Sequence, residues 1–224
     1  MSERYEIKIP ISESNFSVYK TWFLQLKGLS TLYNARIINS IYFDCLDNSS
    51  ARDNISGLFR RSKYRIRWYG NSTDSECFAE IKIKNGRIGK KIVLPTHTKF
   101  DDLKIEDAFL VNNSWFKNPG DTSIIPLIAS KILLPILYVK YQRFYYLFEG
   151  SIRLTFDLSP LFRSFYNKGT KSSWKTDNLN VLEIKFNSEN LSKAKNFISK
   201  SPFVPRKHSK YLRGLALCNK AIYL

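Results

Sequence analysis

The sequence has few residues of the kinds that carry redox and metal chemistry: three Cys, two His and one Met among 224 residues. Cys45, Cys77 and Cys218 are widely spaced, form no CxxC pair and have no histidine at metal-ligand spacing. We therefore expect reduced thiols in a cytosolic protein. Nine Gly and eight Pro are too few for a collagen-like or low-complexity chain.

The sequence also has no long hydrophobic run. Its most apolar stretch, residues 124–139, contains Lys131 and two prolines and is too short and too interrupted to span a bilayer. The first five residues, MSERY, do not resemble the start of a signal peptide. We therefore expect a cytoplasmic protein with no transmembrane segment. Hydrophobic residues at 43% and aromatic residues at 15% exclude a disordered chain.

Acidic residues are scarce relative to basic ones. The chain has 36 Lys and Arg against 19 Asp and Glu, a formal net charge of +17. Such an excess favours a polyanionic partner, which could be a nucleic acid, an anionic membrane or a phosphate-rich substrate. Charge alone does not choose among these three.

Alternation of charged and apolar residues predicts most of the secondary structure. The length and the absence of a composition break predict one α+β domain, residues 1–224, with about eight antiparallel strands. Asn85-Gly86 is a strong hairpin signal. We expect strands at 4–9, 36–44, 62–70, 77–84, 87–94, 138–148, 151–158 and 180–186, helices at 16–28, 46–57, 100–111, 188–199 and 209–221, and an exposed loop at 159–179.

Five predicted strands carry their charges on one face, because residues two apart in a strand share a face. These sets are Arg4, Glu6 and Lys8; Lys63, Arg65 and Arg67; Glu80, Lys82 and Lys84; Arg153 and Asp157, with the uncharged Thr155 between them; and Glu183 and Lys185. An ordinary sheet with its charged face toward water fits this pattern, and so does a closed barrel whose charged face lines a tunnel. A charged tunnel would need a bound polyanion, with the carboxylates pairing cations or holding a divalent metal.

Six short motifs, in order along the chain, resemble the VTC domain. They are Glu6-x-Lys8, Ser40-Ile-Tyr-Phe-Asp44, Lys63-Tyr-Arg-Ile-Arg-Trp-Tyr-Gly70, Glu80-Ile-Lys82, Glu183-Ile-Lys185 and Lys207-His-Ser-Lys210-Tyr-Leu-Arg-Gly214. The VTC domain is the polyphosphate-polymerase domain of vacuolar transporter chaperone proteins. It belongs to the triphosphate tunnel metalloenzymes, together with CYTH domains and RNA triphosphatases. The resemblance implies a closed antiparallel β-barrel with flanking helices, and so favours the tunnel.

The resemblance also implies roles for individual side chains. The implied catalytic cations are Lys8, Arg65, Arg67, Lys82, Arg143 and Lys210, and the implied substrate-binding cations are Lys84, Lys91, Arg153, Lys185 and Lys207, with Lys90 replacing Lys91 if the strand register is shifted by one. Glu183 matches the metal-binding carboxylate of the family. Glu6, Glu80 and Asp157 are further metal-binding candidates. The implied cofactor is Mn²⁺ or Mg²⁺.

One position departs from the wider superfamily. Hydrolase and cyclase members carry Glu-x-Glu-x-Lys on the first strand, whereas this chain has Arg4 in place of the first Glu. The exchange removes a carboxylate and adds a cation, which favours holding a phosphate chain over multi-metal hydrolysis. The SPX domain and membrane segments of the eukaryotic proteins are not expected here.

These observations favour a polyphosphate polymerase that transfers the γ-phosphate of ATP to a growing chain. Such a reaction needs no protein nucleophile, and the sequence has no P-loop and no GxSxG motif. A triphosphate or polyphosphate hydrolase using the same residues is one alternative, and a polyphosphate-binding module without turnover is another. No specific nucleic-acid motif is present, so nucleic-acid binding ranks last.

Overall fold

The computed structural model describes residues 4–71, 75–86, 88–99, 132–165 and 173–218. Within these ranges the fold is a mostly antiparallel sheet with four α-helices, which confirms the predicted α+β class. The helix predicted at 100–111 and the last residues of the one predicted at 209–221 lie outside the described residues. None of the described helices is long and apolar enough to cross a membrane.

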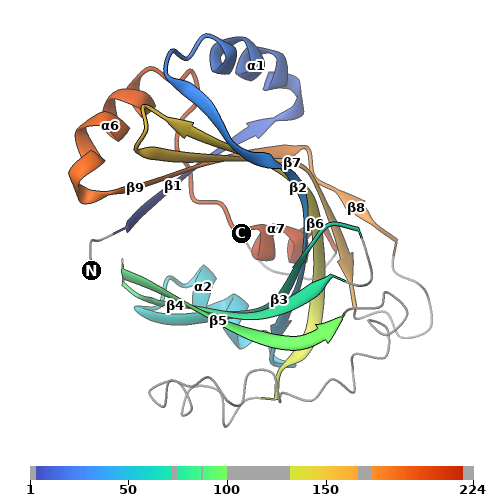
Figure 1. Cartoon of the computed structure of the whole chain (residues 1–224). Coiled ribbons are helices and arrows are strands. Elements are labelled where there is room, and N and C mark those ends of the chain that lie inside the picture. The colour runs from blue at the N-terminus through green and yellow to red at the C-terminus, as the bar shows by residue number, and fades with distance from the viewer. Residues whose placement is uncertain (1–3, 72–74, 87, 100–131, 166–172, 219–224) are drawn as a thin grey trace. The chain divides into compact units, whose positions relative to one another are not determined.

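Nine strands form one sheet in the described part of the chain (Figure 1). They are β1 (Arg4–Ser12), β2 (Leu29–Asp44), β3 (Arg60–Tyr69), β4 (Glu76–Asn85), β5 (Ile88–Lys99), β6 (Leu134–Phe148), β7 (Ile152–Ser164), β8 (Lys175–Thr176) and β9 (Leu179–Asn187). Their order is β1-β9-β7-β6-β2-β3-β4-β5, and β8 pairs with β7.

The strand order does not confirm the predicted closed barrel. The order is an open path, and no ladder joins its two end strands, β1 and β5, within the described residues. Pro10 lies in the end strand β1, where it pairs with Val181 of β9. Proline has no amide hydrogen to donate, so it is tolerated on an edge strand and disfavoured between two partners. The sequence pattern indicates which face of each strand is charged. Because this pattern is the same for an open and a closed sheet, it could not distinguish the two.

The chain forms two compact units that share β2, β6 and β7, so the prediction of one domain over 1–224 stays a prediction. The first unit contains residues 1–37, 141–161 and 176–209. Its helices α1 (Phe16–Leu24) and α6 (Leu191–Ser199), each preceded by one 3₁₀ turn, cover the apolar face of β1, β9 and β7 (Figure 1). The buried cluster formed by these helices and strands includes Ile9, Ile11, Tyr19, Phe23, Leu154, Phe156, Leu182, Ile184 and Phe197.

The second unit contains residues 38–140, 162–175 and 210–224. Its apolar face joins β2, β3 and β4 in a buried cluster that includes Ile41, Phe43, Tyr64, Ile66, Trp68, Ala79 and Ile81. The described residues of this unit include the helices α2 (Ser49–Ile55) and α7 (Lys210–Leu217). Gly214 of α7 packs so closely that a Cβ atom there would lie 2.4 Å from Phe162 Cδ1 and 2.6 Å from Leu137 Cδ2.

The predicted hairpin at Asn85-Gly86 is confirmed. Gly86 has a φ of +59°, a conformation that glycine adopts without steric cost, and it joins β4 to β5. Its amide N–H also donates a hydrogen bond of 2.7 Å to the carbonyl of Phe59. The turn fixes the register of the two strands, and therefore decides which lysines share a face.

The exposed loop predicted at 159–179 is partly wrong. Strand β7 continues to Ser164, and β8 pairs with it over two residues. Residues 166–172 lie outside the described part of the chain. The chain passes through Ser159 with a φ of +50° and continues as a strand. The Pro160 carbonyl then accepts the amide N–H of Asp177 at 3.1 Å.

Candidate functional site

The charged faces of the two units each carry a cluster of ion-paired side chains. We call Arg65, Arg67, Glu80 and Lys91 the Glu80 cluster, and Lys8, Arg143, Asp157, Glu183 and Lys185 the Glu183 cluster. The first lies wholly in the second unit and the other wholly in the first unit. Every residue of both clusters was predicted as a site residue, either from the charge pattern or from the family resemblance.

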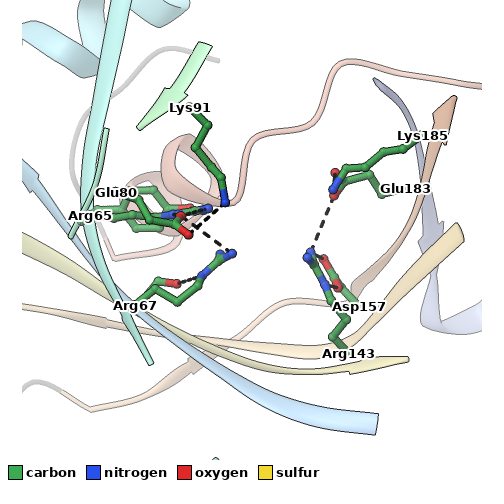
Figure 2. Close-up of polar contacts among 10 residues, drawn as sticks. Arg65, Arg67, Glu80, Lys91, Arg143, Asp157, Glu183 and Lys185 are labelled. Carbon is green, nitrogen blue, oxygen red and sulfur yellow. Dashed lines mark hydrogen bonds and ion pairs between the residues drawn. The ribbon is translucent and has the colours of Figure 1, made fainter. Parts of the chain in front are cut away.

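Three cations surround Glu80. Arg65 Nε lies 2.6 Å from Glu80 Oε2, Lys91 Nζ lies 3.3 Å from Oε1, and an Arg67 nitrogen lies 4.0 Å from Oε2 (Figure 2). Arg65 also forms a second ion pair to Oε2. Glu80 is only 3% exposed and Arg67 only 7%, so this is not the solvated face of an ordinary sheet.

The cations decide the ionisation state of Glu80. Burial by itself raises the pKa of this carboxyl, but the charges of Arg65, Arg67 and Lys91 outweigh burial and lower the pKa from 4.5 to about 2. The carboxylate is therefore ionised at neutral pH. It offsets part of a local charge that is otherwise entirely positive.

This shift predicts a specific loss of stability in acid. Because the folded-state pKa is lowered, Glu80 contributes stability above pH 4.5 that is lost as the pH falls toward 2. A shift from 4.5 to about 2 corresponds to about 3 kcal/mol. Urea unfolding between pH 5 and pH 2.5 should show the free energy of unfolding falling more steeply in the wild type than in Glu80→Gln. Parallel slopes for the two proteins would contradict the assignment.

The same face carries a row of lysines across three strands. Lys63 of β3 is directly opposite Lys82 of β4, and Lys82 is directly opposite Lys91 of β5. Like charges at directly opposed positions destabilise a sheet. The register pairs Lys90 with Ile83, whose side chain belongs to the apolar cluster on the other face. Lys91, and not Lys90, therefore shares the face of the other candidate cations.

Tyr42 contacts the Glu80 cluster, although the sequence assigned it no role in the site. Its hydroxyl accepts a hydrogen bond of 3.2 Å from Arg65, and its ring stacks on Tyr211 of α7 with centroids 5.0 Å apart. Burial raises the pKa of Tyr42, but the charges of Arg65, Arg67 and Lys210 lower it by more than burial raises it. The pKa of Tyr42 therefore lies below its ordinary value of 10. The alternation rule does place Tyr42 on the face of Arg65, since the two are directly opposite.

Asp44 is a second residue whose role the sequence did not reveal. Its Oδ1 atom accepts the amide N–H groups of Cys45 and Ser50 at 2.8 and 2.9 Å, and Oδ2 accepts that of Ala51 at 3.0 Å. Oδ2 also accepts the hydroxyl of Tyr211 at 2.6 Å. Since Tyr211 follows Lys210, Asp44 holds the start of α7 and so positions the predicted cation Lys210.

Arg143 is the centre of the Glu183 cluster. Its Nε and terminal nitrogen donate to the two oxygens of Asp157 at 2.5 and 2.7 Å, and the same terminal nitrogen lies 3.6 Å from Glu183 Oε2 (Figure 2). Asp157 is fully buried. Burial lowers the pKa of Arg143, but Asp157, Tyr141 and Glu183 raise it well above its ordinary value. A planar guanidinium that bonds one carboxylate in this forked manner is held in a fixed orientation.

Glu183 faces three cations. Lys185 Nζ lies 2.7 Å from its Oε1 atom, and the charges of Lys185, Lys8 and Arg143 hold its pKa well below the ordinary value despite burial. Lys8 is itself 3.1 Å from Glu6, and its ammonium donates to the carbonyl of His208 at 3.3 Å. The registers place Lys8 and Thr155 directly opposite Glu183 on its two neighbouring strands.

The remaining candidates lie closer to solvent. Arg153 is exposed and directly opposite Lys185, and Lys207 is exposed on the segment before α7. Lys84 is half-buried and directly opposite Arg61. None of these placements contradicts a role in binding anions.

All four carboxylates proposed to bind a divalent cation are paired with basic side chains in the structure. No group of three or more Asp, Glu, His or Cys side chains gathers to form a cation cage in the described part of the chain. Both oxygens of Asp157 bond to Arg143, and both oxygens of Glu80 face cations. Glu183 also faces cations through both oxygens, and Glu6 lies 3.1 Å from Lys8, so a divalent cation at this pair would have to displace these side chains and take most of its ligands from phosphate and water.

The charged face of each unit therefore gathers basic side chains around carboxylates. The VTC domain model matches residues 3–219, nearly the whole chain, so the chain belongs to the VTC domain family. Comparison with curated proteins gives no match.

Comparison with solved structures finds similar chains at low sequence identity. A protein from Vibrio parahaemolyticus, described provisionally as an adenylate cyclase, is 10% identical with a TM-score of 0.52 over 96% of this chain and 98% of that chain. A protein from Hippeastrum, described as having a dominant triphosphatase activity, is 13% identical with a TM-score of 0.47 over 95% of each chain. At 10% identity, the likeness to the Vibrio parahaemolyticus protein is one of fold alone.

Proposed function

We propose that this VTC domain is a metal-dependent phosphotransferase that extends polyphosphate from the γ-phosphate of ATP. The observation that carries the proposal is the row of Lys63, Lys82 and Lys91 beside Arg65 and Arg67. Five basic side chains gathered on one face create a positive potential that attracts a polyanion. Family membership supports phosphate as the anion.

The cations have distinct tasks in this proposal. Arg65 and Arg67 each present a planar fork that matches two phosphate oxygens, and the lysines supply point charges along the chain. Glu80 orients Arg65 and keeps the local charge from becoming entirely positive. Lys210, placed near Tyr42 by α7, adds a further phosphate contact.

The proposed reaction requires no proton transfer from the protein. An anionic terminal oxygen of the polyphosphate chain attacks the γ-phosphorus of ATP, a P–O bond forms, and the bond from the γ-phosphorus to the β–γ bridging oxygen breaks. ADP leaves with that electron pair. The side chains hold the two phosphate groups in line and offset the charge that spreads over the transferred group.

Arg143, Lys8 and Lys185 bind phosphate in the Glu183 cluster. In this proposal Asp157 is a positioning residue that holds Arg143, since both of its oxygens are bonded to that side chain. Glu183, with Glu6, would hold Mn²⁺ or Mg²⁺, which supplies charge neutralisation at the phosphate oxygens when bound.

Incubation with ATP and Mn²⁺, with separate assays of chain product and free phosphate, tests the proposal. We expect ADP and polyphosphate to appear in step, with little free phosphate. Free phosphate that matches ADP throughout would instead identify a hydrolase. Absence of any ADP with Mn²⁺ or Mg²⁺ would leave a polyphosphate-binding module.

A further inference from the structure

A buried hydroxyl on the charged face of β7 has no hydrogen-bond partner. Thr155 is 8% exposed, and its Oγ1 atom is buried and unbonded. A threonine hydroxyl can donate one hydrogen bond and accept two, and a buried hydroxyl that makes none costs free energy. Buried polar groups in folded proteins are nearly always bonded, so an exception indicates a missing partner.

The fold does not explain why this position is threonine. Its neighbours Leu154 and Phe156 point into the apolar cluster, so Thr155 points to the opposite, charged face. Valine has the same branched shape and an equally high preference for strands, without the cost of an unbonded hydroxyl. Threonine is therefore better explained by what the hydroxyl binds than by packing.

The surroundings of Thr155 indicate the chemistry of the missing partner. Thr155 is directly opposite Glu183 on β9, and Glu183 is directly opposite Lys8 on β1. Glu183 is already engaged, with Lys185 2.7 Å from Oε1 and Arg143 3.6 Å from Oε2. A hydroxyl beside these three cations can donate its proton to an anion that the cations attract.

We infer that Thr155 is a ligand-contact residue whose hydroxyl donates a hydrogen bond to a phosphate oxygen held by Lys8, Arg143 and Lys185. The inference rests on the proposed function, because it takes phosphate as the anion. It assigns to Thr155 a direct contact with substrate that charge patterning does not reveal. The hydroxyl of Thr155 would orient the phosphate, because its hydrogen bond to one oxygen is directional. The lysines would attract the phosphate through their charge.

The test compares Thr155→Val with Thr155→Ser by calorimetric titration with inorganic triphosphate in the absence of metal. Loss of a hydrogen bond to a charged phosphate should weaken binding about tenfold in Thr155→Val. Thr155→Ser keeps the hydroxyl and should bind within about threefold of the wild type. Circular dichroism of both variants verifies that the strand is intact.

Thermal unfolding without ligand is a second measurement, and in it Thr155→Val should gain or keep stability while it loses affinity for triphosphate. Since Thr155→Val removes an unbonded buried hydroxyl, its melting temperature should equal or exceed that of the wild type. A lower melting temperature combined with unchanged triphosphate affinity would show that the hydroxyl serves the fold, for example through Glu183 or an ordered water, and would overturn the inference.

Two further outcomes separate this inference from the proposed function. If Thr155→Val binds triphosphate normally and only requires more Mn²⁺ for turnover, the hydroxyl serves the cation and the inference is wrong. If the wild type itself binds no triphosphate, the proposed function fails together with the inference. Wild-type binding with an equal affinity in Thr155→Val overturns the inference alone.

Discussion

Replacing Arg143 by methionine is expected to lower the free energy of unfolding by about 3–5 kcal/mol. Methionine keeps much of the side-chain volume but leaves the fully buried carboxylate of Asp157 without the forked partner that bonds both of its oxygens. It also removes one of the three cations that hold down the pKa of Glu183. Urea unfolding at pH 7 measures the loss.

Two companion variants identify the cause of that loss. Arg153→Met removes an exposed arginine from the same face and should change the free energy of unfolding by less than about 0.5 kcal/mol. The double variant Arg143→Met/Asp157→Leu replaces the whole pair by apolar groups and should recover most of the lost stability. If the double variant were as unstable as Arg143→Met alone, packing and not the buried charge would be the cause.

Glu183→Gln is expected to abolish metal-dependent turnover while leaving metal-free triphosphate binding unchanged or tighter. Glutamine keeps the shape of the side chain but removes the charge that would hold a divalent cation and that repels phosphate. Calorimetric titrations of both proteins, with and without Mn²⁺, measure the two effects separately. The wild type should gain affinity for triphosphate when Mn²⁺ is added, and the variant should not.

A control variant tests whether the position of the removed charge matters. Glu189→Gln makes the same chemical change at an exposed residue of the turn before α6 and should leave both titrations unaltered. Turnover at the wild-type level in Glu183→Gln would contradict the assignment of the cation to Glu183. It would move the proposed metal site to Glu6, Glu80 or Asp157.

The sequence predicted the charged face because strand alternation is a local property. Arg65, Arg67 and Glu80 lie on one face, and Tyr64 and Ile66 are buried on the other, as the spacing of two residues requires. The choice between Lys90 and Lys91 depended on the hairpin. Asn85-Gly86 predicted the turn but left the register open by one residue, and the strand pairing in the structure decides for Lys91.

Burial and pairing between distant strands could not be predicted in the same way. Nothing local shows that Asp157 is fully buried against Arg143, or that the hydroxyl of Thr155 makes no hydrogen bond. The role of Asp44 depends on Tyr211, which is 167 residues away in the chain. Closure of the sheet was a property carried over from the family resemblance, and the strand order is an open path.

The central claim is that the lysine row and its neighbouring arginines bind a phosphate chain. Calorimetric titration with inorganic triphosphate at constant ionic strength tests it most directly, on the wild type, Lys82→Ala and Lys90→Ala. Lys82 is the middle lysine of the row, whereas Lys90 is paired with Ile83 on the opposite face. We predict saturable binding by the wild type and by Lys90→Ala, and at least about a fivefold weaker affinity in Lys82→Ala, which corresponds to about 1 kcal/mol. Equal affinities in all three proteins, or a wild-type signal that sodium chloride at matched ionic strength reproduces, would contradict the claim.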